Sequence, residues 1–243
     1  MKIAVLGYGR MGREVEIAAV KKGHEISALF DIDHPLNASS NLNGAEVVID
    51  FTLAPAVIDN LKNAAALGVP VVEGTTGWNS QLEVLKTIDN LTVLHSPNFS
   101  IGVYQFTRLI AAAARLFGSL EEYDCYLHEW HHTGKADSPS GTAKKLAGLL
   151  LDHMPGKTEA LYETSFGKIS PHQLHVTSTR AGAIPGTHEV GFESVYDSIQ
   201  LKHQAHGREG FAQGAVRAAE WIIGRRGVYT MDDFMRSLTD SIK

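Results

Sequence analysis

The sequence has a single cysteine, Cys125, so no disulfide can form within the chain. It also has no run that approaches the roughly 18 apolar residues of a membrane-spanning helix. The apolar run at the start is interrupted by Gly7 and Arg10, which is too early for the core of a signal peptide. Because disulfides are rare in the reducing cytoplasm, these absences predict a cytoplasmic protein.

Concentrated charge of one sign is also lacking. The formal net charge is −5 over 243 residues, with no long run of acidic or basic residues. A broad electrostatic surface for nucleic acids or membranes requires such a concentration, so we expect neither as a partner. The hydrophobic fraction of 44% and the charged fraction of 20% are typical of globular proteins, and the length allows one large or two modest domains.

Short apolar runs alternate with helical patterns over the first hundred residues. The expected strands are Ile3–Leu6, Glu25–Phe30, Val47–Phe51, Val69–Glu73 and Thr92–His95. The expected helices are Arg10–Lys22, Ala54–Leu67 and Gln81–Ile88. Strands this apolar are buried on both faces, so the pattern predicts an α/β fold with a doubly wound parallel sheet of the Rossmann type.

The pattern changes after Pro97. We expect helices at Gly102–Phe117, Thr142–Leu151 and Gly210–Ile223, and strands at Tyr123–Leu127, Leu174–Arg180, Thr187–Phe192 and Ser198–His203. Three successive strands without intervening helices predict a mixed or antiparallel sheet in a second, α+β unit. The helix expected at Gly210–Ile223 could return to the first domain.

A glycine motif, GYGRMG, follows the first expected strand and opens the first helix. Gly7 permits a tight turn, Gly9 lets the backbone approach a pyrophosphate, and Gly12 allows close packing of helix on strand. Asp31 lies 19 residues after Gly12, where a carboxylate can bind a ribose 2′-hydroxyl. The motif predicts an NADH or NADPH site, and Asp31 favours NADH because it would repel a 2′-phosphate.

Two further loops, Gly74–Trp78 and Ser96–Gly102, follow later strands of the same sheet. Ligands collect at this edge of a parallel sheet, and small or hydroxylated residues permit close approach to a cofactor. Taken alone, each loop is more consistent with an ordinary turn than with a cofactor loop.

The segment His128–His132 reads HEWHH and matches the HExxH zinc signature literally. That signature requires a helix, where residues four apart lie about 6 Å from each other. The preceding YDCYL predicts a strand, in which four residues span about 13 Å, too far for two histidines to share one zinc ion. We therefore expect no metal site here.

The residues that follow indicate an anion site. Lys135 provides a cation, and Ser140-Gly141-Thr142 begins an expected helix whose N–H groups can bind a carboxylate. An imidazole can deliver a proton near neutral pH, so His131 or His132 could act as an acid. The alternative is a capped helix start beside two histidines with a purely structural role.

Seven ordered blocks resemble the 4-hydroxy-tetrahydrodipicolinate reductase (dihydrodipicolinate reductase) family of lysine biosynthesis. The blocks are GYGRMG, DFT, GTTG, SPNFSIGV, EWHHTGKADSPSGTA, RAGAIPGTHEV and REGFAQGAV, spread over nearly the whole chain. The E-x-H-H-x-x-K-x-D-x-P-S-G-T string is the most specific of them. It narrows the expected anion to a cyclic dicarboxylate.

The resemblance implies a dinucleotide-binding domain formed by residues 1–101 and 207–243. Residues 102–206 would form the substrate-binding and oligomerisation domain of a homotetramer. Catalysis would involve His131 as the acid and Lys135, and the substrate would be bound by His132, Lys135, Ser140, Gly141 and Thr142. The implied cofactor-binding residues are Gly7, Tyr8, Gly9, Arg10, Met11, Gly12, Asp31, Phe51, Thr52, Gly74, Thr75, Thr76, Ser96, Pro97, Asn98 and Phe99.

The family's reaction is the reduction of 4-hydroxy-tetrahydrodipicolinate by NADH or NADPH, with loss of water, to tetrahydrodipicolinate. Two alternatives stay open at this point. A related amino-acid dehydrogenase, such as one acting on aspartate, would share the nucleotide fold without needing the histidine string. A redox sensor that binds NADH to control a partner would need no acid.

Overall fold

The computed structural model describes residues 1–240, and its contacts divide the chain into two compact units. One unit combines Met1–Ile101 with the segment that starts at Arg208, and the other is Gly102–Gly207. No helix among the described residues is long and apolar enough to span a membrane.

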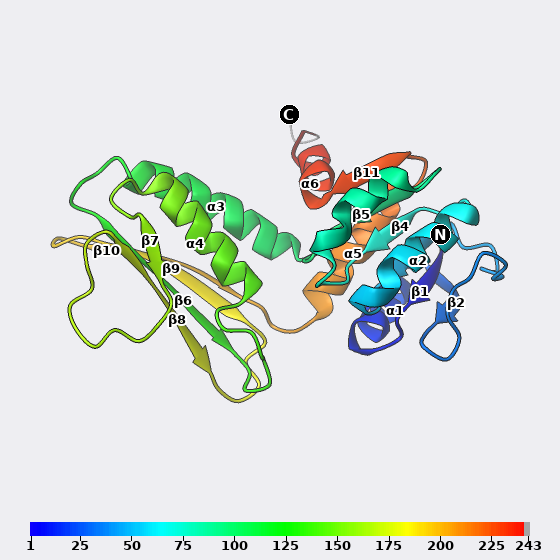
Figure 1. Cartoon of the computed structure of the whole chain (residues 1–243), viewed down its shortest axis with the longest axis horizontal. Helices are drawn as coiled ribbons and strands as arrows, with labels where there is room; N and C mark the ends of the chain where they lie inside the picture. The colour runs from blue at the N-terminus through cyan, green and yellow to red at the C-terminus, as the bar shows by residue number, and fades with distance from the viewer. Residues whose placement is uncertain (241–243) are drawn as a thin grey trace. The chain divides into compact units, whose positions relative to one another are not determined.

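The first unit is built on a six-stranded parallel sheet, which Figure 1 shows with its helices. Its strands are β1 (Lys2–Leu6), β2 (Glu25–Phe30), β3 (Val47–Asp50), β4 (Val71–Glu73), β5 (Thr92–His95) and β11 (Gly227–Thr230). The spatial order is β11-β5-β4-β3-β1-β2, and every neighbouring pair is parallel. The chain moves to opposite sides of β1 to form β2 and β3, so the loops after β1 and β3 meet at the switch point of a doubly wound sheet.

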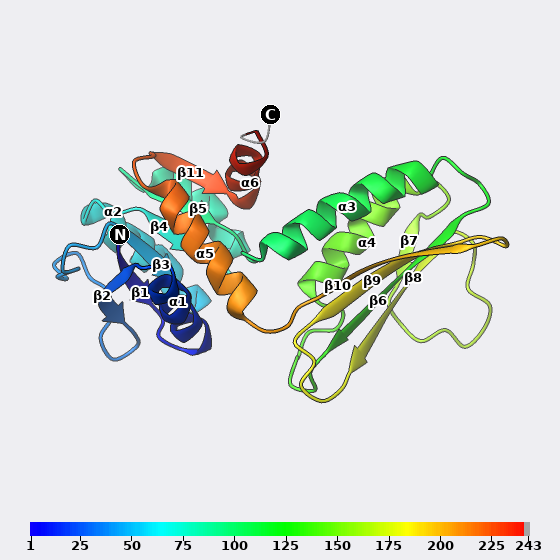
Figure 2. The same cartoon turned by 180° about the vertical axis from the view of Figure 1, so that it is seen from behind.

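Helices cover this sheet because its strands are apolar on both faces. They are α1 (Arg10–Lys21), α2 (Val57–Ala66), α5 (Glu209–Ile222) and α6 (Met231–Asp240), with 3₁₀ helices η1 (Ala54–Ala56) and η2 (Asn79–Thr87). One core cluster joins α2 residues such as Leu61 to Ala4, Val48 and Val93 of the sheet. Helices α1 and α5 pack against each other, as the view from behind shows (Figure 2).

The second unit has a five-stranded mixed sheet. Its strands are β6 (Asp124–His131), β7 (Glu159–Leu161), β8 (Gln173–Arg180), β9 (Thr187–Glu193) and β10 (Ser198–Gln204). In the order β10-β9-β6-β8-β7, β6 pairs parallel with β8 and antiparallel with β9. Helices α3 (Ile101–Phe117) and α4 (Gly141–His153) lie on one face of this sheet (Figures 1 and 2). The core between them includes Ile110, Leu127, Leu146 and Phe192.

The predicted fold class is confirmed in both units, and the predicted helix over 210–223 does belong to the first one. Several local expectations are wrong. The helix expected over 81–88 is the 3₁₀ helix η2, and the strand expected over 123–127 continues to His131. Elements β7, β11 and α6 were not predicted. The two strands are only three and four residues long, too short for a clear periodic pattern.

Candidate active site

The glycine motif forms the turn between β1 and α1. Gly7 has φ = +81°, and a Cβ on it would lie 2.4 Å from the carbonyl oxygen of Phe51, so no larger residue fits. A Cβ on Gly12 would lie 2.4 Å from the carbonyl oxygen of Gly7. At Gly9, by contrast, a Cβ would meet no protein atom within 4 Å. Gly7 and Gly12 are therefore required by the fold, while the open space at Gly9 fits the approach of a phosphate.

Helix α1 begins after Gly9 with no side-chain cap. Its first N–H groups lack intrahelical partners and carry the positive end of the helix dipole, so they fit an anion. A cavity of about 400 Å³ opens beside this helix start. It is lined by Gly9, Arg10, Met11, Phe51, Thr52, Leu53, Ala54, Gly74, Thr75, Thr76, Pro97, Asn98, Phe99 and Phe211. These features fit a dinucleotide.

Eleven of the sixteen predicted cofactor residues line this cavity, and five do not. The five are Gly7, Tyr8, Gly12, Asp31 and Ser96. Gly7 and Gly12 shape the backbone beneath the cavity. Ser96 Oγ donates to the carbonyl oxygen of Asn98 and so shapes the loop, and Tyr8 donates a hydrogen bond to Glu16. Sequence reasoning missed Leu53, Ala54 and Phe211; the first two follow the DFT block directly, whereas Phe211 comes from the distant helix α5.

Asp31 lies just beyond β2 and is exposed. Its Oδ1 atom accepts hydrogen bonds from the backbone N–H groups of Asp33 and His34, each at 3.0 Å. The carboxylate therefore organises the turn after β2 through one oxygen. That turn holds Asp31 in place at the end of the strand next to β1.

Two buried acids hold the backbone of two loops that line this cavity. Asp50 ends β3 and accepts a hydrogen bond from the backbone N–H of Thr52 at 2.8 Å. Glu73 ends β4 and accepts one from the N–H of Thr75 at 2.6 Å. Burial raises the pKa of both carboxyl groups, and the charge of Asp50 raises the pKa of Glu73 further.

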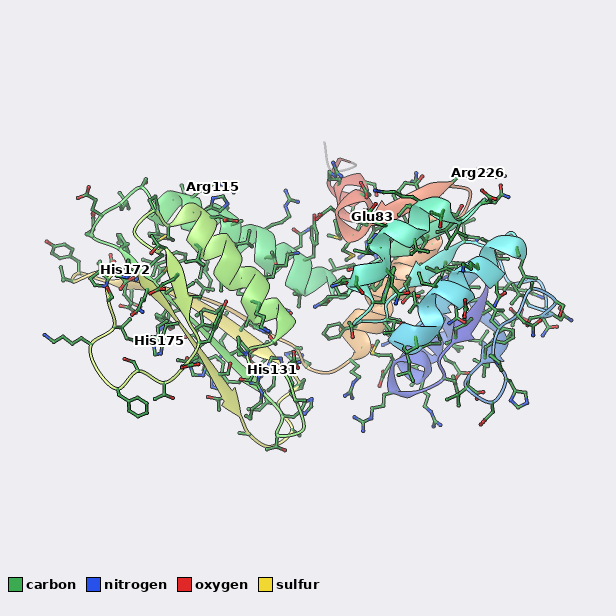
Figure 3. The ribbon with its side chains drawn as sticks, viewed as in Figure 1. Glu83, Arg115, His131, His172, His175 and Arg226 are labelled. Atoms are coloured by element: carbon green, nitrogen blue, oxygen red, sulfur yellow. The ribbon has the colours of Figure 1, made fainter. Side chains whose placement is uncertain are left out.

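The second unit gathers the histidine-rich string at the end of β6, where Figure 3 labels His131. Burial alternates along β6, so Glu129 and His131 face the covered side of the sheet while His128 faces the other. His128 bonds there to the hydroxyl groups of Thr177 and Thr179. The strand rules out the helical zinc arrangement that the HExxH signature requires.

His132 and Lys135 lie in the turn after β6, closed by a hydrogen bond from Lys135 N–H to the carbonyl oxygen of His132 at 3.1 Å. Lys135 Nζ lies 2.6 Å from Asp137 Oδ1, and this ion pair lowers the pKa of Asp137. Lys135 is thus fixed near the histidines. An incoming carboxylate would compete with Asp137 for the ammonium group.

Ser140 is the N-cap of α4, and its Oγ accepts the N–H of Ala143 at 3.1 Å. Gly141 and Thr142 are the first helical residues, so their N–H groups stand at the positive end of the helix dipole. The expected capped helix start is present. The five predicted substrate residues therefore lie on one continuous stretch, between the end of β6 and the first turn of α4.

Glu129 joins this stretch to the neighbouring strands. It is fully buried, and its Oε1 accepts hydrogen bonds from Ser140 N–H at 3.0 Å and from Arg180 Nη2 at 2.8 Å. Burial acts to raise the pKa of Glu129, but the neighbouring His188 ring and the hydrogen bonds from Ser140 and Arg180 hold it well below its usual range. Glu129 is therefore a carboxylate at every working pH.

His131 is almost fully buried beside this carboxylate, with its Nδ1 atom 3.4 Å from Glu129 Oε2. Burial lowers the pKa of His131 to about 4, although Glu129 acts in the opposite direction. The positive charges of Lys135 and Arg180 also disfavour a protonated ring. Without a ligand His131 is neutral near pH 7, so a proton donor here needs added negative charge nearby.

Sequence reasoning missed three residues of this cluster: Glu129, Arg180 and His188. His188 Nε2 lies 3.5 Å from Glu129 Oε2 and 3.2 Å from Ser140 Oγ. Arg180 ends β8 and His188 lies on β9, and both belong to the quoted RAGAIPGTHEV block. This block was the sequence signal that could have identified the two residues. Their position next to Glu129 depends on the pairing of β8 and β9 with β6.

Two family profiles together match nearly the whole chain. The family profile of the dihydrodipicolinate reductase N-terminus matches residues 1–99, and that of the C-terminus matches residues 102–235. The chain belongs to the dihydrodipicolinate reductase family. The family predicted from the seven sequence blocks is thereby confirmed.

Relatives of the family align along almost the whole chain. The 4-hydroxy-tetrahydrodipicolinate reductase of Christiangramia forsetii is 36% identical over 98% of this chain and 99% of its own length. The enzyme of the same name from Archaeoglobus fulgidus is 39% identical over 97% of this chain and 100% of its own length.

A solved structure shares the fold. Dipicolinate-bound dihydrodipicolinate reductase from Paenisporosarcina sp. TG-14 has a TM-score of 0.71 and 22% identity, covering 95% of this chain and 97% of that one.

Proposed function

We propose that this protein reduces 4-hydroxy-tetrahydrodipicolinate to tetrahydrodipicolinate with NADH or NADPH, in the diaminopimelate and lysine pathway. The observation that carries the proposal is the match of both halves of the chain to one reductase family. The cluster around His131 adds the cation, helix start and imidazole that a dicarboxylate substrate requires. Neither a related amino-acid dehydrogenase nor a redox sensor has a comparable observation in its favour.

Binding of the substrate is assigned to the stretch from His132 to Thr142. Lys135 donates to one carboxylate, and the N–H groups of Gly141 and Thr142 donate to the other. His132 and Ser140 contribute further donors at the two ends of the stretch. Two negative charges thus enter a region where burial, together with the charges of Lys135 and Arg180, otherwise lowers the pKa of His131.

The bound dianion is what makes His131 an acid. Negative charge close to the ring raises its pKa, so the proton is taken up as the substrate binds. Loss of water leaves the substrate as a conjugated imine, and the nicotinamide group supplies a hydride to ring carbon 4 when bound. His131 then gives a proton to the reduced substrate, completing the overall addition of two hydrogens.

The cofactor is assigned to the cavity beside the start of α1. Its pyrophosphate is placed at the N–H groups after Gly9, and Phe51, Thr52 and the two later loops line the remainder. Asp31 binds the ribose 2′-hydroxyl through the oxygen that the turn does not use, which favours NADH over NADPH.

The assembly and location are proposed on the family resemblance and on composition. We propose a homotetramer formed through the unit Gly102–Gly207, and a cytoplasmic location. Light scattering of the purified chain tests the first: four times the mass of 26.4 kDa supports the tetramer, and a monomer contradicts it.

The deciding experiment couples the preceding synthase of the pathway to this protein and follows the loss of NADH or NADPH absorbance. We expect turnover by the native chain and strongly reduced turnover by His131→Gln. His128→Gln is the matched control, because this histidine is on the same strand but the opposite face of the sheet. If neither cofactor is oxidised, the proposed reaction is wrong; if His131→Gln keeps full activity, only the acid is misassigned.

A further inference from the structure

The carboxylate of Glu129 uses its two oxygens differently. Oε1 accepts hydrogen bonds from Ser140 N–H at 3.0 Å, Ser178 Oγ at 2.8 Å and Arg180 Nη2 at 2.8 Å. These donors come from the start of α4 and from β8. Three converging donors fix the orientation of the carboxylate and leave its second oxygen for another partner.

The second oxygen, Oε2, points between two histidine rings. It lies 3.4 Å from His131 Nδ1 and 3.5 Å from His188 Nε2. Within the described residues, Oε2 and His131 Nδ1 are both buried and both without a hydrogen-bond partner. Buried polar groups are nearly always paired, and catalytic hydrogen bonds are often long before a ligand is bound. The two atoms are complementary if Nδ1 carries a proton.

We propose that Glu129 is a positioning residue that holds a proton on His131 Nδ1 and so assigns the transferable proton to Nε2. The proposal rests on the acid role of His131 given above. In the protonated ring both nitrogens carry hydrogen, and the proton on Nε2 goes to the reduced substrate. The neutral ring that remains keeps its Nδ1–H directed at Glu129, ready to be protonated again at Nε2.

The surroundings of Nε2 agree with this assignment. Nε2 faces Gly186, and a Cβ placed on that glycine would lie 3.1 Å from it. The missing side chain leaves space beside the nitrogen that gives up the proton. The Glu129 side of the ring is closed, since Nδ1 is buried.

A metal ion is the competing occupant of the same position. One ligand atom each from Glu129, His131 and His188 lie within 4.8 Å of one another, a spacing that a divalent cation could bridge. However, Arg180 already binds the same carboxylate, and Lys135 and Arg180 both act against positive charge on His131. A proton therefore fits this position better than a doubly charged ion.

Replacement of Glu129 by glutamine separates these possibilities. The carbonyl oxygen of the glutamine must occupy the Oε1 position, because three donors converge there. Its NH₂ group then replaces Oε2 and donates toward His131 Nδ1, which must give up its proton. Glu129→Gln should convert neutral His131 from the Nδ1–H to the Nε2–H tautomer, and should disfavour the protonated ring.

The direct readout is nuclear magnetic resonance of the full chain labelled with ¹⁵N-histidine, in which the two tautomers give distinct nitrogen shifts. His131 signals are assigned by their loss in His131→Gln. We expect Nδ1–H in the native protein and Nε2–H in Glu129→Gln. The matched control is Glu189→Gln, since Glu189 is adjacent to His188 on β9 but bonds to Tyr126 on the other face of the sheet.

Kinetics provide a second readout. An acid is active only while protonated, so activity is lost as pH rises through its pKa in the substrate complex. Glu129→Gln lowers that pKa, and the loss should begin at lower pH by about one unit or more. Because one pKa unit changes the protonated fraction about tenfold where the pH lies above the pKa, kcat on the alkaline side of the profile should fall about tenfold. KM for the cofactor should not change, whereas a general packing defect would alter both.

Three results would overturn the proposal: an Nε2–H tautomer of neutral His131 in the native protein, an unchanged tautomer in Glu129→Gln, or stoichiometric zinc bound through His131. The first measurement needs no variant, so it decides the matter even if Glu129→Gln does not fold. Failure of the proposed acid role is distinguishable, because His131→Gln would then keep its activity while the tautomer result stood by itself.

Discussion

Asp50 and Glu73 occupy paired positions on the neighbouring strands β3 and β4, and both side chains are fully buried. Each holds the first loop residues after its strand by a backbone hydrogen bond. Burial raises the pKa of both carboxyl groups, and the charge of Asp50 raises the pKa of Glu73 further, so Glu73 is the acid of this pair that holds a proton more readily. The loops after β3 and β4 are therefore held by two buried acids with raised pKa values.

Replacing Glu73 by glutamine should stabilise the protein at neutral and higher pH. A raised pKa means that the folded protein holds a proton that the unfolded chain releases, so this group makes stability fall as pH rises above the unfolded pKa. Glutamine keeps the bond to Thr75 without titrating. We expect a rise of about 2–4 °C in Tm per kcal/mol gained, larger at pH 8 than at pH 5. A Tm difference that does not change with pH would contradict the raised pKa of Glu73.

Alanine at Gly12 and at Gly9 should have separable effects. At Gly12 the new Cβ would meet the carbonyl oxygen of Gly7, so overpacking of about 1–3 kcal/mol should lower Tm and also weaken NADH binding. At Gly9 the Cβ meets no protein atom. Gly9→Ala should leave Tm unchanged but raise the Kd for NADH, measured by fluorescence titration. Unchanged binding in Gly9→Ala would show that no phosphate approaches there.

Removing the charge of Asp31 should relax the choice of cofactor. Asp31→Asn keeps the Oδ1 acceptor that organises the turn, so the loop should hold its shape. Relief of ~1 kcal/mol of repulsion would raise the ratio of kcat/KM for NADPH over NADH roughly fivefold. Asp33→Asn is the neighbouring control. Equal ratios in the native protein and in Asp31→Asn would exclude Asp31 as the ribose ligand.

Loss of the Lys135 ammonium group should weaken the transition state. A hydrogen bond to a charged group contributes about 1.5–3 kcal/mol, so kcat/KM of Lys135→Ala should fall roughly ten- to a hundredfold or more. Lys145→Ala removes an exposed lysine from α4 and should be nearly neutral. Full catalytic efficiency in Lys135→Ala would remove this residue from the site.

Binding of a dicarboxylate should make the protein take up a proton. The pKa of His131 is lowered to about 4 in the absence of ligand, and two carboxylates beside it should raise that pKa. Calorimetry with dipicolinate at about pH 6, in two buffers of different ionisation enthalpy, measures this uptake. The uptake should disappear in His131→Gln and decrease at higher pH. If native protein and variant take up equal amounts, another group is responsible.

Much of the fold could be predicted because its signals are local. The turn after β1 needs glycine because a side chain would collide with the backbone, as the close contact at Gly12 illustrates, and the glycine motif can be read directly from the sequence. The alternation of apolar strands and amphipathic helices likewise determined a parallel sheet. Short elements such as β7 and β11 escaped because three or four residues carry no period, and their pairing with β8 and β5 depends on the rest of the sheet.

The site likewise has a part that the sequence predicts and a part that only the tertiary structure shows. The sequence by itself determined the family, and it located the loops predicted to bind the cofactor and the string that contains His131 and Lys135. Only the tertiary structure decided that Arg180 and His188, 51 and 59 positions after Glu129, contact its carboxylate. Strand pairing produces these contacts, and burial then lowers the pKa of His131 in a way that no local pattern encodes.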